Sequence, residues 1–142
     1  MKIFLDANIL VAVACNEYPL FTNCSRLLSL SDNPKFEVYT SPLCLAITYY
    51  FSEKKDGNDL ARKKLLLLSN KLNITTVDSA VVKKVNSNRS IHDFEDGMEY
   101  YSAVNSKCKC IITEDKGDYY FSDIEILNAE EFLMKYAVKK NN

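Results

Sequence analysis

The sequence is poor in several features that particular protein classes require. Its 142 residues include one histidine and three glycines, and no glycine-rich loop of the kind that cradles phosphates is present. This absence disfavours a nucleotide-binding doubly wound protein. No apolar run approaches the roughly 20 residues that cross a bilayer. Met1-Lys2-Ile3 leads directly into an apolar run, without a charged leader or a small-residue cleavage site. We therefore expect a cytoplasmic protein with no membrane partner.

Excess positive charge is also absent. The formal net charge is -1, which argues against a strongly basic nucleic-acid-binding protein. It leaves open an enzyme that touches nucleic acid over a short stretch, because a local patch and metal ions can supply the positive field.

The cysteines do not form a recognisable disulfide or zinc pattern. There are five of them, an odd number that indicates reduced thiols. Cys108 and Cys110 are one residue apart in an expected strand and should face the same side. A zinc site would need two more ligands, and His92 is the sole histidine. We interpret the cysteines as small core residues.

What the chain does have is the composition of a folded α/β domain. Hydrophobic residues make up 47% and charged residues 26%, and the length fits one domain over residues 1–142. Apolar runs and helical periodicities alternate along the chain. The expected strands are 3–5, 36–40, 74–77, 108–113 and 123–127. The expected helices are 8–15, 20–30, 42–53, 58–72, 78–85, 91–105 and 129–138. This alternation predicts a parallel sheet sandwiched between helices.

The first ten residues carry the strongest local pattern. Ile3-Phe4-Leu5 reads as a strand buried on both faces, and it ends in Asp6, followed by Asn8 and a helix. Ligands in open parallel sheets sit at the carboxyl ends of strands, so Asp6 stands where chemistry usually occurs. The alternative is that Asp6 or Asn8 only caps the helix.

Further carboxylates occur at matching places in the predicted topology. Asp93, Glu95 and Asp96 open the 91–105 helix, and Asp115 and Asp118 follow the fourth strand. If the first and fourth strands are neighbours, Asp6 and Asp115 face one crevice. Crowded carboxylates select Mg²⁺ or Mn²⁺, which would activate a water against a phosphodiester. Each group also has a simpler interpretation, as a helix-start acid or as a polar turn.

Four ordered blocks of sequence resemble the motifs of the PIN domain family, in particular its branch of VapC-like toxins. The blocks are Leu5-Asp6-Ala7-Asn8-Ile9-Leu10, Ser41-Pro42-Leu43 with Ala46 and Tyr49-Tyr50, Asp93 to Ala103, and Ile111 to Tyr119. The segment from Asp123 to Leu133 is similar to the tail of the family. The resemblance therefore covers nearly the whole chain.

This resemblance implies a five-stranded parallel sheet and a metal-dependent endoribonuclease that cleaves single-stranded RNA, the toxin of a type II toxin–antitoxin pair. The implied cofactor is Mg²⁺ or Mn²⁺. Four acids match family positions and are the expected catalytic residues: Asp6, Asp96, Asp115 and Asp118. The first three are the expected metal ligands, and Asn8 and Thr113 are expected to support them.

One family position departs from the pattern. The second acid of many PIN nucleases, on the helix after the second strand, aligns here with Ile47. The nearest acid is Glu53, about one and a half helical turns further on. A catalytically lapsed PIN module that binds a protein or RNA therefore remains the alternative. The expected partners are RNA, an antitoxin and a second copy of the chain, and an apolar groove near Tyr49, Tyr50 and Phe51 would favour a protein partner.

Overall fold

The chain forms a five-stranded parallel sheet covered by helices, as expected. The computed structural model describes residues 1–138, and its strands follow the spatial order β3-β2-β1-β4-β5. The strands are β1 (Lys2–Leu5), β2 (Glu37–Thr40), β3 (Asn73–Ile74), β4 (Cys110–Ile112) and β5 (Glu125–Leu127). Ile3, Phe4 and Leu5 of the central strand are fully buried, which confirms that β1 is covered on both faces.

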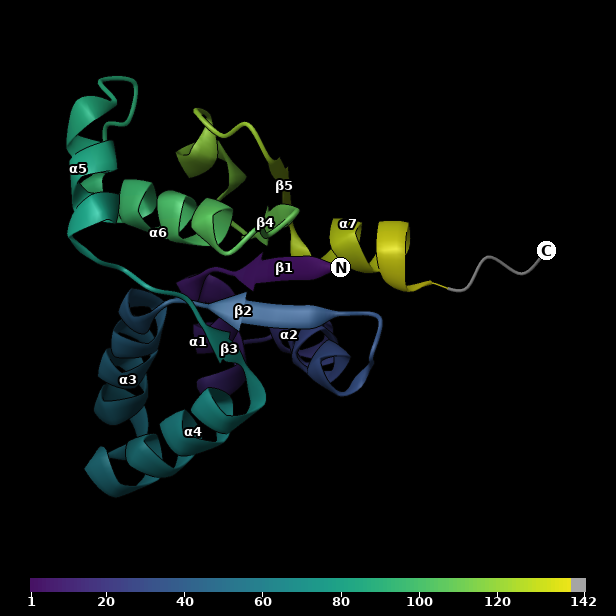
Figure 1. The fold of residues 1–142 in the computed structure, drawn as a ribbon. Coiled ribbons are helices and arrows are strands. Elements are labelled where there is room, and N and C mark those ends of the chain that lie inside the picture. The colour runs from purple at the N-terminus through teal and green to yellow at the C-terminus, as the bar shows by residue number, and fades with distance from the viewer. Residues whose placement is uncertain (139–142) are drawn as a thin grey trace.

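Helices pack against both faces of this sheet. Figure 1 shows α5 and α6 on one side of it and α3 and α4 on the other. The helices are α1 (Ala7–Ala14), α2 (Leu20–Ser29), α3 (Pro42–Asp56), α4 (Asn58–Lys71), α5 (Ser79–Ser87), α6 (Phe94–Asn105) and α7 (Ala129–Phe132). Short 3₁₀ turns follow at η1 (Leu30–Asp32) and η2 (Lys116–Tyr119), and a π-helical segment, η3, spans Leu133–Ala137.

Several predicted boundaries were wrong because local hydrogen bonds end the elements elsewhere. The helix expected from residue 91 begins at Phe94, since Asp93 has extended backbone and its Oδ1 accepts from the Asp96 amide at 3.0 Å. The strand expected over 74–77 is β3, and its pairing ends where the Thr75 amide donates to the Thr40 carbonyl at 2.8 Å. The expected closing helix is α7 followed by η3, and its last residue, Val138, lies beyond both.

The core interpretation of the cysteines is confirmed. All five are buried and unpaired by disulfides: Cys15, Cys24, Cys44, Cys108 and Cys110. Burial raises the pKa of Cys108 and of Cys110 to about 12, so both thiols stay protonated at neutral pH. No helix within residues 1–138 combines the length and apolar character needed to cross a membrane.

The register of the sheet brings distant acidic segments together. β1 and β4 are neighbours, with Leu5 paired to Ile112, and the Asp6 amide donates to the Ile112 carbonyl at 3.0 Å. The chain then leaves β4 at Thr113, whose amide donates to Leu127 of β5 at 2.9 Å. Asp6 and the residues after Thr113 therefore start from adjacent points on the carboxyl edge of the sheet.

Candidate active site

One pocket at this edge collects all four aspartates that the sequence singled out. Its volume is about 400 Å³. It is lined by Asp6, Ala7, Asn8, Val11, Glu17, Ile47, Phe51, Glu95, Asp96, Asp115 and Asp118. Asp6 and Asp115 thus face one crevice, as expected for neighbouring strands, and Asp96 lines the same crevice. Glu95, which the sequence grouped with Asp96 at the helix start, also lines the pocket, and so does Glu17, which the sequence did not single out.

Asp6 is both a helix cap and a pocket residue. Its Oδ1 accepts from the Ala7 amide at 2.8 Å, which caps α1. Its Oδ2 accepts from the Thr113 hydroxyl at 2.9 Å. Burial raises the pKa of the Asp6 carboxyl; the Ala7 and Thr113 bonds oppose this rise, and the nearby Asp115 adds to it. The two interpretations of Asp6 therefore do not compete, because the cap fixes the carboxylate that faces the pocket.

Asn8 and Thr113 tie the two strand ends together. The Asn8 Nδ2 donates to Thr113 Oγ1 at 2.9 Å and to Asp115 Oδ2 at 3.2 Å. In return, the Glu114 amide donates to Asn8 Oδ1 at 3.1 Å, and the Asp115 amide donates to Thr113 Oγ1 at 3.1 Å. Thr113 is fully buried. These bonds hold the Asp6 and Asp115 carboxylates in a fixed relation.

Asp96 is a pocket aspartate with a strongly raised pKa. It stands in the first turn of α6. Burial, followed by the charges of Asp93 and Asp118, raises its pKa to about 7. Burial and the neighbouring acids also raise the pKa of Glu95. Carboxylates in this pocket thus raise one another's pKa, as expected for acids crowded without a cation.

Ile47, which stands where many PIN nucleases have an acid, does face the pocket. Ile47 of α3 lines it and is half-buried. Glu53, the nearest acid further along α3, is exposed and is not among the lining residues. The site therefore has an apolar wall where many members of the resembled family have a carboxylate.

We expect Ile47→Glu to strengthen divalent-metal binding, because Ile47 lines the pocket as well as packing against the core, so the new carboxylate can reach the pocket. Mn²⁺ affinity by titration calorimetry should rise about tenfold, the effect of adding one close charge in a partly solvated site. A melt without metal should show a modest loss of stability from added repulsion. Unchanged affinity together with a loss of several kcal/mol, typical of burying an unpaired charge, would contradict this expectation.

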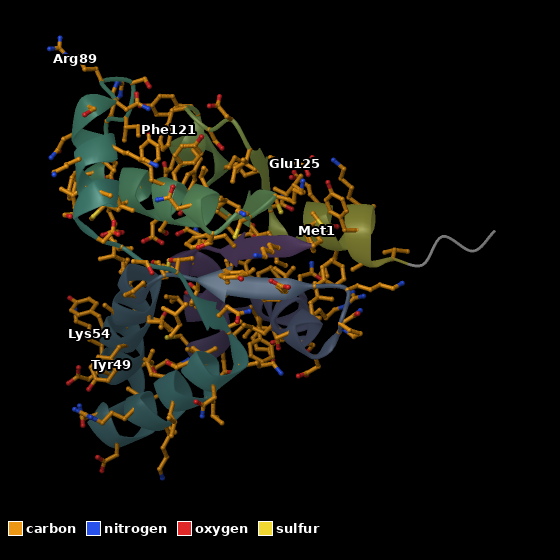
Figure 2. The ribbon with its side chains drawn as sticks, in the orientation of Figure 1. Met1, Tyr49, Lys54, Arg89, Phe121 and Glu125 are labelled. Carbon is orange, nitrogen blue, oxygen red and sulfur yellow. The ribbon has the colours of Figure 1, made fainter. Side chains whose placement is uncertain are left out.

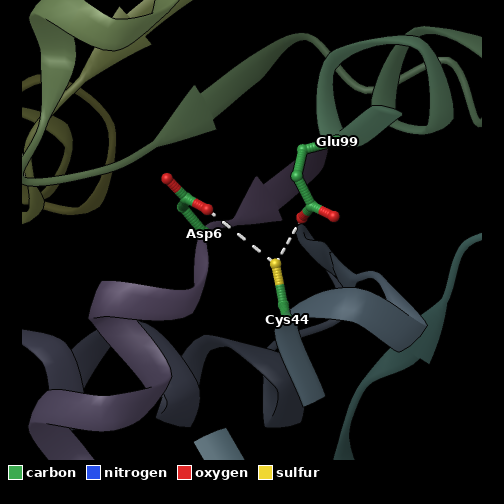
Figure 3. Close-up of side chains that lie close together, drawn as sticks. All are labelled: Asp6, Cys44 and Glu99. Atoms are coloured by element: carbon green, nitrogen blue, oxygen red, sulfur yellow. Dashed lines mark hydrogen bonds between the residues drawn. The ribbon is translucent and has the colours of Figure 1, made fainter. Parts of the chain in front are cut away.

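Sequence reasoning missed a buried group behind the pocket. Glu99 of α6 is 2% exposed, and both of its oxygens accept from the Ser41 hydroxyl, at 2.7 and 2.8 Å. The Cys44 thiol also donates to Glu99 and lies 3.8 Å from Asp6 Oδ1. Figure 3 shows Cys44 between the two carboxylates. The spacing of Asp96 and Glu99 places both on one side of the helix, but spacing alone does not show that Glu99 is buried.

Burial is the largest influence on the pKa values of Glu99 and Cys44. It raises the pKa of Glu99 to about 7, against the lowering effect of the Cys44 and Ser41 hydrogen bonds. It also raises the pKa of the Cys44 thiol well above its ordinary value, with the Glu99 charge adding to the rise. Cys44 therefore remains a protonated donor.

Comparisons with known proteins agree with this architecture. Ribonuclease VapC1 of Aquifex aeolicus (strain VF5) is 27% identical over 139 residues, 95% of each chain. The VapBC2 structure from Rickettsia felis, bound to a fragment of promoter DNA, superposes with a TM-score of 0.68 at 18% identity, covering 90% of this chain and 98% of that one. VapC20 of Mycobacterium tuberculosis, described as a toxin that cleaves the Sarcin-Ricin loop, gives a TM-score of 0.61 at 16% identity over 77% of this chain and 86% of that one. The two structures share the fold. The model of the PIN domain matches residues 2–117, and the chain belongs to the PIN domain family.

Proposed function

We propose that this chain is a divalent-metal-dependent endoribonuclease that cleaves single-stranded RNA and is the toxin of a type II toxin–antitoxin pair. The observation that carries the proposal is the convergence of Asp6, Asp96, Asp115 and Asp118 on one pocket from three separate segments. The similarity to a protein named ribonuclease VapC1 over 95% of both chains supports the activity. The fold that the chain shares with VapC20 is consistent with a toxin.

The donor set of the pocket fits Mg²⁺ or Mn²⁺. Its acids offer hard oxygen ligands, which these ions prefer, and no Lys, Arg or His is among its lining residues. Burial raises the pKa values of Asp6 and Asp96, and the charges of neighbouring acids add to both rises. In the proposal Asp6, Asp96 and Asp115 hold the ion, and Asp118 tunes the site or holds a second one. A bound cation would offset phosphodiester charge and make water a better nucleophile.

The chain's own residues orient the acids and restrict access. Asn8 and Thr113 fix the Asp6 and Asp115 carboxylates through direct hydrogen bonds. Ile47 and Phe51 of α3 supply an apolar wall on another side of the pocket. A phosphate could approach this acidic pocket only after a cation had reduced the repulsion, so the geometry favours a strict metal requirement.

RNA would also need contacts outside the acidic pocket. Lys83, Lys84 and Arg89 line a separate hollow together with Ser87, Asn88 and Tyr101. This hollow involves α5 and α6, and the short loop between these helices leads to Asp93, the cap of α6. Arg89 projects outward at the tip of that loop in Figure 2. Lysine and arginine contacts to phosphates supply most sequence-independent affinity for nucleic acid, so this hollow is the proposed path for the RNA backbone.

An exposed apolar surface supports a protein partner. It is formed by side chains of α3 and α4 whose exposed fractions are 52% for Tyr50, 46% for Phe51, 45% for Leu60, 62% for Leu66 and 70% for Leu67. A neighbouring hollow is lined by Val13, Ala14, Asn16, Lys64, Leu67 and Leu68. Exposed apolar patches of this kind mark interaction sites. We assign this surface to an antitoxin, with a second copy of the chain as the competing occupant.

A cleavage assay tests the activity. Purified protein should cut unstructured RNA oligonucleotides with Mg²⁺ or Mn²⁺, and EDTA should abolish the cutting. Expression of the wild-type gene should arrest growth, and co-expression of an antitoxin-like small gene beside it should relieve the arrest. Failure to cut any of a varied set of RNA substrates with either ion would reject the nuclease.

The second candidate is a PIN module that binds RNA or protein without catalysis. Ile47 favours this non-catalytic candidate, because the pocket has an apolar side chain where many PIN nucleases have an acid. This candidate predicts RNA or protein binding in the same samples that show no cleavage.

A further inference from the structure

The acid missing from the pocket wall has a counterpart on the core side of Asp6. Glu99 follows Asp96 by one turn of α6, so the two side chains share one side of the helix. Whereas Asp96 lines the pocket, Glu99 is buried. The Asp6 carboxylate, the Cys44 sulfur and the Glu99 carboxylate each place one atom within 4.8 Å of the other two. Asp6 therefore has the pocket on one side and a second carboxylate behind it.

The surroundings hold Glu99 in one position. Ser41, the N-cap of α3, donates its hydroxyl to both Glu99 oxygens, and Cys44 donates from the first turn of that helix. Both donors belong to α3, the helix that carries Ile47. The helix that has Ile47 in place of a pocket acid thus supplies, with its N-cap, the donors that bind the buried Glu99.

The carboxylates of this cluster form no ion pair: within residues 1–138, no salt bridge joins Asp6 or Glu99 to a lysine or an arginine. A further polar group faces Asp6: the Tyr119 hydroxyl lies close enough to that carboxylate to lower its pKa. Tyr119 is 2% exposed, and its hydroxyl has no hydrogen-bond partner in the described part of the chain.

We propose that Glu99 supplies, from behind Asp6, the carboxylate that position 47 lacks. This rests on the metal site of the proposed function. Glu99 is a positioning residue: it acts on the ion through Asp6, because it adds a negative charge beside that carboxylate and constrains it through Cys44. A glutamate at position 47 would act from the pocket side of Asp6, and Glu99 acts from the core side.

Titration calorimetry with Mn²⁺ alone tests the assignment in a four-member set: wild type, Glu99→Gln, Ile47→Glu and the double variant. Glu99→Gln keeps shape while removing charge, and should weaken Mn²⁺ binding about tenfold. The double variant should regain affinity to within about threefold of wild type, because the charge returns on the other side of Asp6. Glu53→Gln removes an exposed charge from α3 and should bind Mn²⁺ as tightly as wild type does.

Further variants separate charge from packing. Glu99→Asp keeps the charge, so its Mn²⁺ affinity should stay within about threefold of wild type. A tenfold loss in a folded Glu99→Asp protein would overturn the charge argument. Unchanged Mn²⁺ binding in a folded Glu99→Gln protein would overturn it as well.

Failure of the proposed nuclease would be distinguishable in the same samples. If wild type binds Mn²⁺ and Glu99→Gln binds it equally well, the Glu99 assignment fails while the metal site stands. If the expected affinities are found but no RNA is cleaved, the assignment stands and the nuclease fails. Absence of Mn²⁺ binding by wild type would reject both.

Discussion

Asp6→Asn should reduce RNA cleavage by roughly 100-fold or more, the scale seen when a directly acting charged or hydrogen-bonding group is lost. Asparagine remains a good helix cap, so it can still accept from the Ala7 amide and leave α1 intact. Removing the charge also removes the cost of burying it, which is what raises the pKa of Asp6. We therefore expect the variant to melt at or above the wild-type temperature while losing activity.

A matched set makes this result specific. Asp96→Asn should lose activity to a similar degree, because Asp96 lines the same pocket. Asp123→Asn serves as the control, since this exposed acid is not among the pocket residues. Cleavage measured with labelled RNA at saturating Mg²⁺ gives the rates. Wild-type rates in Asp6→Asn would remove Asp6 from the proposed site.

The meeting of Asp6 with the acids after Thr113 could be predicted from the sequence, because this meeting depends on the order of the strands rather than on side-chain detail. A buried strand that ends in Asp6 and a second strand that ends in Thr113 are recognisable from their apolar runs. Once the two strands are neighbours, with Leu5 opposite Ile112, the acids after them must meet. Whether Ile47 faces the pocket or the core was the open question at that position; in the structure it lines the pocket and also packs against the core.

The inner cluster could not be predicted in the same way. Glu99 sits in a helix with apolar neighbours, and nothing in its spacing distinguishes a buried carboxylate from a solvated one. Its burial depends on donors from Ser41 and Cys44, which lie 58 and 55 residues away in sequence. Cys44 was interpreted as a small core residue, which its burial confirms, but its thiol also serves as a hydrogen-bond donor.

Metal-free protein should be more stable at pH 5.5 than at pH 7.5. The pKa values of Asp96 and Glu99 rise from 3.8 and 4.5 to about 7 in the folded protein. Between about pH 4 and pH 7 the folded state thus binds more protons than the unfolded one, and stability falls as pH rises through that window. Glu125 and Glu131 have lowered pKa values, so their contributions change below this window.

The size of the effect follows from linkage. One pKa unit corresponds to about 1.4 kcal/mol; after solvent screening at the half-exposed Asp96 is allowed for, about 2 kcal/mol remains for the two groups. For a domain of this length that is a melting-temperature difference of roughly 5 °C. Calorimetric melts in EDTA at both pH values measure it, and Asp96→Asn should show a smaller difference.

Saturating Mn²⁺ at pH 7.5 should remove most of this difference, because a cation that binds the ionised acids of the folded state stabilises it by mass action. The same ion should have less effect at pH 5.5, where protons compete for the carboxylates. A higher melting temperature at pH 7.5 than at pH 5.5 in EDTA would contradict the crowded-acid description of the pocket, since it would require these carboxyls to be stabilised rather than destabilised in their ionised form.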